Sequence, residues 1–162
     1  MDKNGREEKF IDMVKQNERV IYKVCSFYAS EEDPLNDLYQ DVVCNLWAAY
    51  PKFRGECSAS TWIYRVALNT CISNFRKKKR ASQNIDLYQL QDAFIQSEDL
   101  TDEIKEMYRL IHQLKNLERA IILLYLEEKS YQEIADITGL SLSNVAVKLK
   151  RIKEKLIKMS NL

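Results

Sequence analysis

Residues 130–152, SYQEIADITGLSLSNVAVKLKRI, contain an apolar helical pattern that reaches Gly139 and starts again behind a cluster of serines. Ser130 and Glu133 have the spacing of a capping box, in which each side chain satisfies a free backbone amide of the other residue. Gly139 stands where the connection needs a residue that tolerates a positive φ angle. The stretch therefore predicts two short helices joined by a tight turn, which is typical of a helix-turn-helix motif.

The two faces of this motif have different chemistry. We expect Ala135 to allow a close helix crossing, Leu140 and Leu142 to hold the turn, and Ser143 to cap the second helix. The expected inner residues are Ile134, Ile137, Val145, Leu149, Ile152 and Leu156. The expected outer residues of the second helix are Ser143, Asn144, Ala146, Val147, Lys148, Lys150 and Arg151. A recognition helix presents such residues to base edges and phosphates, so we predict duplex DNA binding; an ordinary helical hairpin on a larger domain is the alternative.

The composition favours an all-α protein. The chain has 162 residues but only 3 glycines and 2 prolines, whereas strands joined by tight turns need many more. No apolar run is long enough to cross a membrane, and the start MDKNGREEKF lacks the apolar segment of a signal peptide. We therefore expect a cytoplasmic protein that is not itself in a membrane.

The residues that usually carry catalysis or metal binding are sparse. Cys25, Cys44, Cys57 and Cys71 are widely spaced without a C-x-x-C pair, and His112 is the only histidine. We expect four reduced, mostly buried thiols, no metal, no cofactor and no small-molecule substrate. No set of acid, base and nucleophile can be assembled from the motifs, so an enzyme is not expected.

Charge is segregated along the chain although the net charge is only +1. Residues 75–80, FRKKKR, are basic, residues 86–106 carry an acidic excess, and residues 148–158 are basic again. This order suggests two elements that face a polyanion, joined by an acidic connector. Solvated lysine-rich helices are the simpler alternative for either basic segment taken alone.

The helical periodicity divides the chain into two small helical domains, 1–80 and 103–162, joined by a linker at 81–102. Helices are expected over residues 6–30 and 35–50, the second ending at Pro51. After the loop KFRGECSAS, Ser60 is the expected N-cap of a third helix that runs to residue 80. From Asp102 onward the helical pattern returns and leads into the helix-turn-helix.

Two stretches in the first domain resemble a known family. DLYQDVVCNLW (37–47), followed by FRGECSASTWIYRVALNTCISNFRKKKR (53–80), resembles the polymerase-docking and promoter-melting helices of bacterial sigma factors. The length and the order of motifs are similar to the extracytoplasmic-function (ECF) group, which keeps only the second and fourth conserved regions. The resemblance implies a transcription initiation factor that binds core RNA polymerase, reads a minus-thirty-five duplex and melts a minus-ten element.

The resemblance also implies roles for individual residues. Asp37, Gln40 and Asp41 share one helix face and would dock on the clamp coiled coil of the β′ subunit, while the second domain would meet the flap of β. Residues implied at the minus-ten element and the upstream duplex edge are Ser58, Ser60, Tyr64, Asn69, Arg76, Lys77, Lys78, Lys79 and Arg80. Asn69 would read a flipped base, and the basic residues would hold phosphates. For Tyr64 a place in the core and a base-stacking role are equally open, whereas Trp62 is expected in the core.

Partners and rival functions follow from the same resemblance. It implies promoter DNA and core polymerase as partners, together with an anti-sigma factor. The main alternative is a stand-alone helix-turn-helix repressor or activator, whose residues 1–80 would form a dimerisation or sensor module. A helical adaptor that binds no DNA is the second alternative.

Overall fold

The computed structural model describes residues 3–81 and 101–161, with side chains up to residue 74 in the first range. The N-terminal half contains α1 (Lys3–Gln16), α2 (Glu18–Tyr28), α3 (Leu35–Ala49), a short 3₁₀ turn η1 (Tyr50–Lys52) and α4 (Ala59–Ala81). The C-terminal half contains α6 (Asp102–His112), α7 (Asn116–Leu126), α8 (Tyr131–Thr138) and α9 (Leu142–Ser160). The described part is all helix and turn, so the predicted fold class is confirmed.

Residues 6–30, expected to form one helix, lie in two helices. The pattern over residues 6–30 predicts a continuous helix, but the structure breaks it at Asn17, between α1 and α2. The Asn17 side chain donates from Nδ2 to the carbonyl of Met13 at 2.9 Å. Asparagine competes for backbone groups in this way, and the chain changes direction where it does so. The single-helix expectation was wrong for this reason.

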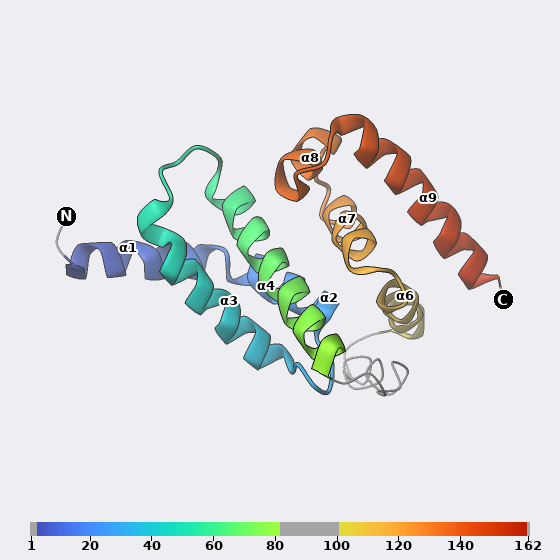
Figure 1. The fold of residues 1–162 in the computed structure, drawn as a ribbon, viewed down its shortest axis with the longest axis horizontal. Helices are drawn as coiled ribbons and strands as arrows, with labels where there is room; N and C mark the ends of the chain where they lie inside the picture. The colour runs from blue at the N-terminus through green and yellow to red at the C-terminus, as the bar shows by residue number, and fades with distance from the viewer. Residues whose placement is uncertain (1–2, 82–100, 162) are drawn as a thin grey trace.

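The N-terminal helices form a bundle in which α2 and α3 both pack on α4 (Figure 1). Buried side chains on α3 are Leu38, Val42 and Leu46, each one turn apart. On α4, Ile63, Ala67 and Thr70 are buried and Val66 is partly buried. The buried face of α4 is wider than these four residues, because Tyr64, Leu68 and Cys71 are also buried.

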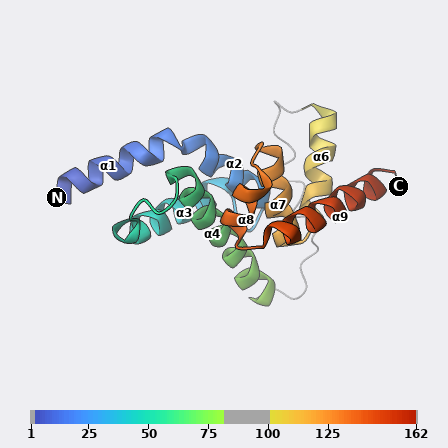
Figure 2. The ribbon, with the colours of Figure 1, turned by 90° about the horizontal axis from the view of Figure 1, so that it is seen from above.

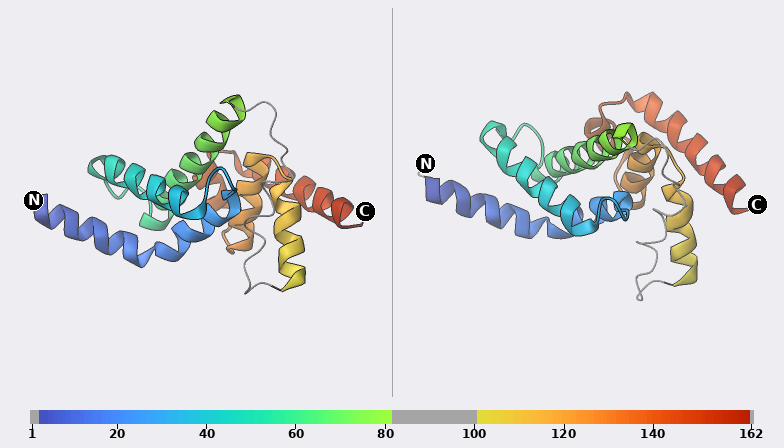
Figure 3. Two further views of the ribbon diagram at one scale, coloured as in Figure 1. Left: turned by 90° about the horizontal axis from the view of Figure 1, so that it is seen from below. Right: turned by 60° about the horizontal axis from the view of Figure 1, so that its bottom comes forward.

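The C-terminal half packs against this bundle. α4 contacts α8, and α2 contacts both α6 and α7. The views from above and below show the C-terminal half lying against α2 and α4, with α9 running outward to the C-terminus and the two termini at opposite ends of the molecule (Figures 2 and 3). Buried apolar residues of both halves belong to one cluster, from Phe10 in α1 to Ile152 in α9. The two halves therefore share a core in this conformation.

Two further expectations concern membranes and thiols. In the described ranges, no helix is long and apolar enough to cross a membrane. All four cysteines are free, but only Cys25 and Cys71 are buried; Cys57 is partly buried and Cys44 is exposed. The expectation of mostly buried thiols is therefore half right.

Most of the predicted linker, residues 82–100, lies outside the described residues, so the domain boundaries stay a prediction.

Candidate nucleic-acid interface

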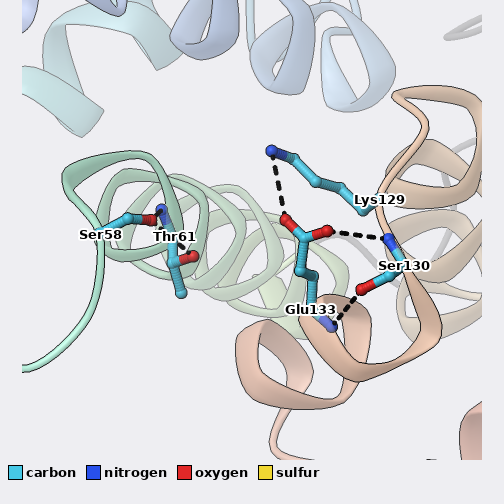
Figure 4. Close-up of polar contacts among 5 residues, drawn as sticks. All are labelled: Ser58, Thr61, Lys129, Ser130 and Glu133. Carbon is cyan, nitrogen blue, oxygen red and sulfur yellow. Dashed lines mark hydrogen bonds and ion pairs between the residues drawn. The ribbon is translucent and has the colours of Figure 1, made fainter.

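The helix-turn-helix is built by local hydrogen bonds at its start. Ser130 Oγ accepts from the backbone amide of Glu133 at 3.1 Å, and Glu133 Oε1 accepts from the amide of Ser130 at 3.1 Å (Figure 4). These bonds lower the pKa of Glu133, because they favour its charged form. Lys129 Nζ lies 3.8 Å from the other carboxylate oxygen of Glu133. The predicted capping box is confirmed.

The turn of the motif differs in detail from the prediction. Gly139 ends α8 with a φ angle of 79°, as expected for a residue without a Cβ. The cap of α9 is Ser141, whose side chain accepts from the amide of Asn144 at 3.2 Å, so the prediction of Ser143 was wrong. Leu142, expected to hold the turn, is 50% exposed, and only Leu140 packs against the core.

The outer face of α9 is open to solvent, as a DNA-reading helix requires. Val145, Leu149 and Ile152 are buried, and Leu156 is partly buried, so the predicted inner stripe is confirmed. The exposed residues of the opposite face are Ser143, Asn144, Ala146, Val147, Lys150 and Arg151, and Lys148 is partly exposed. Val147 is 47% exposed, an apolar surface suited to the methyl group of a thymine.

The acidic face of α3 is also exposed. Asp37, Gln40 and Asp41 all point away from the core. Asp41 Oδ2 accepts from Asn74 Nδ2 of α4 at 2.9 Å. A second bond, from Asn45 Nδ2 to Thr70 Oγ1 at 2.9 Å, ties the same two helices together. The acidic face is thus held in a fixed position relative to α4.

The loop between η1 and α4 is anchored at both ends. At its start, the Phe53 ring stacks on Trp62, with centroids 4.6 Å apart and planes at 21°. Gly55 has a φ angle of 73°, which allows the chain to turn sharply there. At its end, Ser58 Oγ accepts from the amide of Thr61 at 3.1 Å and lies 3.0 Å from Thr61 Oγ1 (Figure 4). Ser58 is therefore the cap of α4, and the prediction of Ser60 was wrong.

The residues predicted at the minus-ten element differ in accessibility. Asn69 and Ser58 are exposed, and Ser60 is partly exposed. Tyr64 is 2% exposed, and burial raises its pKa to about 12, so its ring is not available for stacking in this conformation. Trp62 is partly buried and packs against Phe53 and Tyr50, close to the core position expected of it. The side chains of Arg76, Lys77, Lys78, Lys79 and Arg80 lie outside the described residues, although their backbone belongs to α4.

Sequence patterns missed two arginines that join the halves. Arg119 of α7 is 5% exposed and donates to three carbonyls: Phe27 at 3.3 Å, His112 at 2.8 Å and Leu114 at 3.2 Å. Burial lowers its pKa, and its guanidinium also lies 5.2 Å from the centroid of the Tyr28 ring. The signal was present, since Arg119 directly precedes the apolar run AIILLYL of this helix.

The second missed residue is Arg65 of α4. Its Nε and Nη2 atoms donate to the carbonyl of Asp136 in α8, at 2.9 Å and 2.6 Å. Its Nη1 donates to Cys57 Sγ at 3.7 Å. Arg65 lies four residues before Asn69 and so on the same helix face, a relation visible in the sequence. Only the fold could reveal its contact with α8.

Comparison with known proteins identifies the family. Residues 13–81 match the family model "Sigma-70 region 2", and residues 104–156 match "Sigma-70, region 4". An ECF RNA polymerase sigma-E factor of Haemophilus influenzae is 27% identical over 164 residues, covering 93% of this chain and 86% of the relative. RNA polymerase sigma factor YlaC of Bacillus subtilis is 32% identical over 131 residues, 75% of each chain. The chain is an ECF-type RNA polymerase sigma factor.

Two solved structures have the same fold. One is the sigma factor RpoE in complex with the anti-sigma factor NepR from Bartonella quintana, with a TM-score of 0.75 and 17% identity over 96% of this chain and 98% of that one. Another is CnrH in complex with the cytosolic domain of CnrY, with a TM-score of 0.68 and 18% identity over 96% of this chain and 89% of that one. This sigma factor is therefore a transcription initiation factor, and its N-terminal half is region 2 rather than the sensor module of a stand-alone regulator. Its relatives are sigma factors rather than enzymes.

Proposed function

We propose that this sigma factor docks on the clamp of core RNA polymerase through Asp37, Gln40 and Asp41, and directs the enzyme to promoters with two separate DNA contacts. The observation that carries this proposal is the exposed acidic face of α3, which Asn74 fixes against the proposed melting helix α4. An acidic face fits a basic coiled coil, and the bond to α4 would place that helix relative to the polymerase.

We assign reading of the minus-thirty-five duplex to α9. Ser143, Asn144, Ala146 and Val147 would face base edges, and Lys148, Lys150 and Arg151 would bind phosphates. Their exposure on one side of α9, opposite a buried apolar stripe, supports this assignment.

We assign capture of the melted minus-ten element to the loop before α4 and to Asn69. A base taken out of the duplex costs a few kcal/mol, which a pocket must offset by hydrogen bonds and stacking. Asn69 is exposed on α4 and has both donors and an acceptor, while Ser58 and Ser60 lie at the end of the loop. Arg76, Lys77, Lys78, Lys79 and Arg80 would bind the upstream duplex edge. Tyr64 could stack on a base only if α8 moved away from α4.

We also propose an anti-sigma factor as a partner and the bacterial cytoplasm as the place of action. One of the two structural neighbours is a sigma factor in complex with the anti-sigma factor NepR, and this chain has the same fold. The flap of the β subunit is the proposed polymerase contact of the C-terminal half.

The test is transcription in vitro from a genomic promoter library, with purified core polymerase in the presence and absence of the protein. We expect new transcripts with shared upstream sequences. The absence of any added transcript would overturn the proposal.

Asp37→Lys with Asp41→Lys should abolish core binding in a pull-down without unfolding the chain. The control, Glu7→Lys with Glu8→Lys on exposed α1, makes the same charge change and should leave core binding intact. Asn69→Ala should weaken permanganate reactivity of the minus-ten element more than closed-complex formation.

A further inference from the structure

The Arg65 guanidinium holds α4 to α8 through a neutral acceptor. Two of its N–H groups converge on one carbonyl oxygen, that of Asp136, at 2.9 Å and 2.6 Å. Among the described residues, no carboxylate lies within ion-pair distance of it. Its positive charge is therefore hydrogen-bonded but not neutralised by a neighbouring anion.

A phosphate offers the same geometry with a stronger attraction. Arginine presents its N–H groups as a planar fork that matches phosphate oxygens, and bonds between charged partners are roughly twice as strong as neutral ones. The Asp136 carbonyl thus occupies the place that a nucleic-acid phosphate could take. Lysine would not substitute fully, because it is a point charge without the fork.

The position of Arg65 places it beside the proposed base reader. Arg65 and Asn69 are four residues apart on α4, about 6 Å along the axis. Arg65 also donates to Cys57 Sγ at the end of the loop, which keeps the side chain directed toward that loop. A strand with one base held at Asn69 and the loop would carry its backbone past Arg65.

We propose that Arg65 binds a phosphate of the melted minus-ten strand, and that it does so by giving up the carbonyl of Asp136. The two contacts are mutually exclusive, because the same Nε and Nη2 atoms make both. Arg65 is thus a positioning residue for the captured base, and in the free chain it fastens α8 over the melting helix. This inference rests on the proposed function of α4.

The phosphate contact is tested in holoenzyme with promoter DNA whose minus-ten segment is unpaired, taken from a promoter recovered by transcription in vitro. Arg65→Ala should weaken binding about tenfold and reduce the slope of log affinity against log salt by about 0.7, the value for one phosphate on a single strand. Arg65→Lys should restore the slope but only part of the affinity. Arg109→Ala, which removes the same charge from an exposed side chain of α6, is the control and should change neither.

The contact with α8 is tested in the free full-length chain by small-angle X-ray scattering. Arg65→Ala should raise the fraction of chains with separated halves and hence the radius of gyration, and Arg109→Ala should not. A wild-type salt slope for Arg65→Ala, or an unchanged radius of gyration, overturns the exchange. Failure of the underlying proposed function looks different, because wild-type holoenzyme would then yield no promoter and no melting.

Discussion

Arg119 shows how a buried charge can be held without a counter-ion among the described residues. Its three acceptors lie at the last turn of α2 and just at the end of α6, where helix dipoles direct negative potential. The Phe27 carbonyl belongs to the N-terminal half, whereas those of His112 and Leu114 belong to the C-terminal half. One side chain thus satisfies backbone groups from both halves. Its Nε has no hydrogen-bond partner among the described residues, so the ring of Tyr28 is the remaining support on that side.

Arg119→Ala should lower the free energy of unfolding by about 3 kcal/mol, because three carbonyls, two of them buried, lose their donor and a cavity remains. Arg119→Lys should lower the free energy of unfolding by less, since an ammonium can still donate to some of the three acceptors, though not to all of them. Urea denaturation followed by circular dichroism measures both. Equal stability of Arg119→Ala and wild type would mean that water replaces the guanidinium without loss.

His112 makes stability depend on pH. Burial, followed by the charge of Arg119, lowers its pKa from 6.5 to about 4. Its neutral form is favoured in the folded chain, so this stability is fully present above pH 6.5 and is lost as pH falls toward 4. Between pH 7 and pH 5 the wild type should lose about 2 kcal/mol more than His112→Gln in urea denaturation. The chain has one histidine, so its NMR titration is unambiguous, and a folded-state midpoint near 6.5 would contradict the expectation.

At the level of elements, Ser141 and Ser143, separated by Leu142 in the turn, make a matched pair of test positions. Ser141 Oγ accepts from the amide of Asn144, whereas Ser143 lies 3.3 Å from Ser141 Oγ and caps nothing. Ser141→Ala should lower stability by about 1 kcal/mol, and Ser143→Ala should be close to neutral. The urea midpoints of the two variants show which serine caps α9. If Ser143 were the cap, Ser143→Ala would have the lower midpoint and Ser141→Ala would be close to wild type.

Helix existence was predictable because its signals are local. The Ser130 and Glu133 pair, the positive φ of Gly139 and the stripe of Val145, Leu149 and Ile152 depend only on near neighbours in the chain. Cap positions were displaced by two residues at α4 and at α9, since each helix start offers two serines two positions apart, and either can accept the bond. The Asn17 break was missed because asparagine is tolerated both inside a helix and at a bend.

The contacts between halves were not predictable from periodicity, because each joins residues that lie far apart in the chain. Tyr28 Oη donates to the carbonyl of Asn116 at 2.9 Å, a bond that spans 88 positions. The site was therefore predicted as two separate DNA readers, and the exposed residues of α4 and α9, such as Asn69 and Asn144, fit that expectation. The contact of Arg65 with Asp136 follows only from the packing of α8 on α4. The position of Lys129 Nζ, 5.3 Å from the centroid of the buried Tyr64 ring, likewise depends on how the two halves pack.

At the scale of the whole molecule, this packing and promoter geometry are in conflict. A duplex rises about 3.4 Å per base pair, so elements about 25 base pairs apart are separated by roughly 85 Å. α4 and α8 are in direct contact here. A chain that reads both elements at once must therefore separate its halves, and the contacts that join them oppose that separation in the free protein.

The Lys23–Glu127 ion pair allows us to measure how strongly contacts between the two halves resist their separation. Lys23 Nζ of α2 lies 2.8 Å from Glu127 Oε1, at the end of α7, and both side chains are partly buried. Lys23→Glu or Glu127→Lys alone should favour separation by about 1 kcal/mol, because like charges then meet, and the double reversal should recover part of the loss. The radius of gyration of the free chain, by X-ray scattering, reports the change.

The control for this cycle is the exposed Glu106–Arg109 pair, whose two members lie on α6 alone. Reversing it changes the same charges but touches no contact between the halves, so the radius of gyration should stay at the wild-type value. If the Lys23 and Glu127 reversals also left it unchanged, singly and together, the ion pair would contribute nothing to closure. The opposition to separation would then rest on Arg119, Tyr28 and Arg65, whose bonds to backbone carbonyls do not depend on a pair of opposite charges.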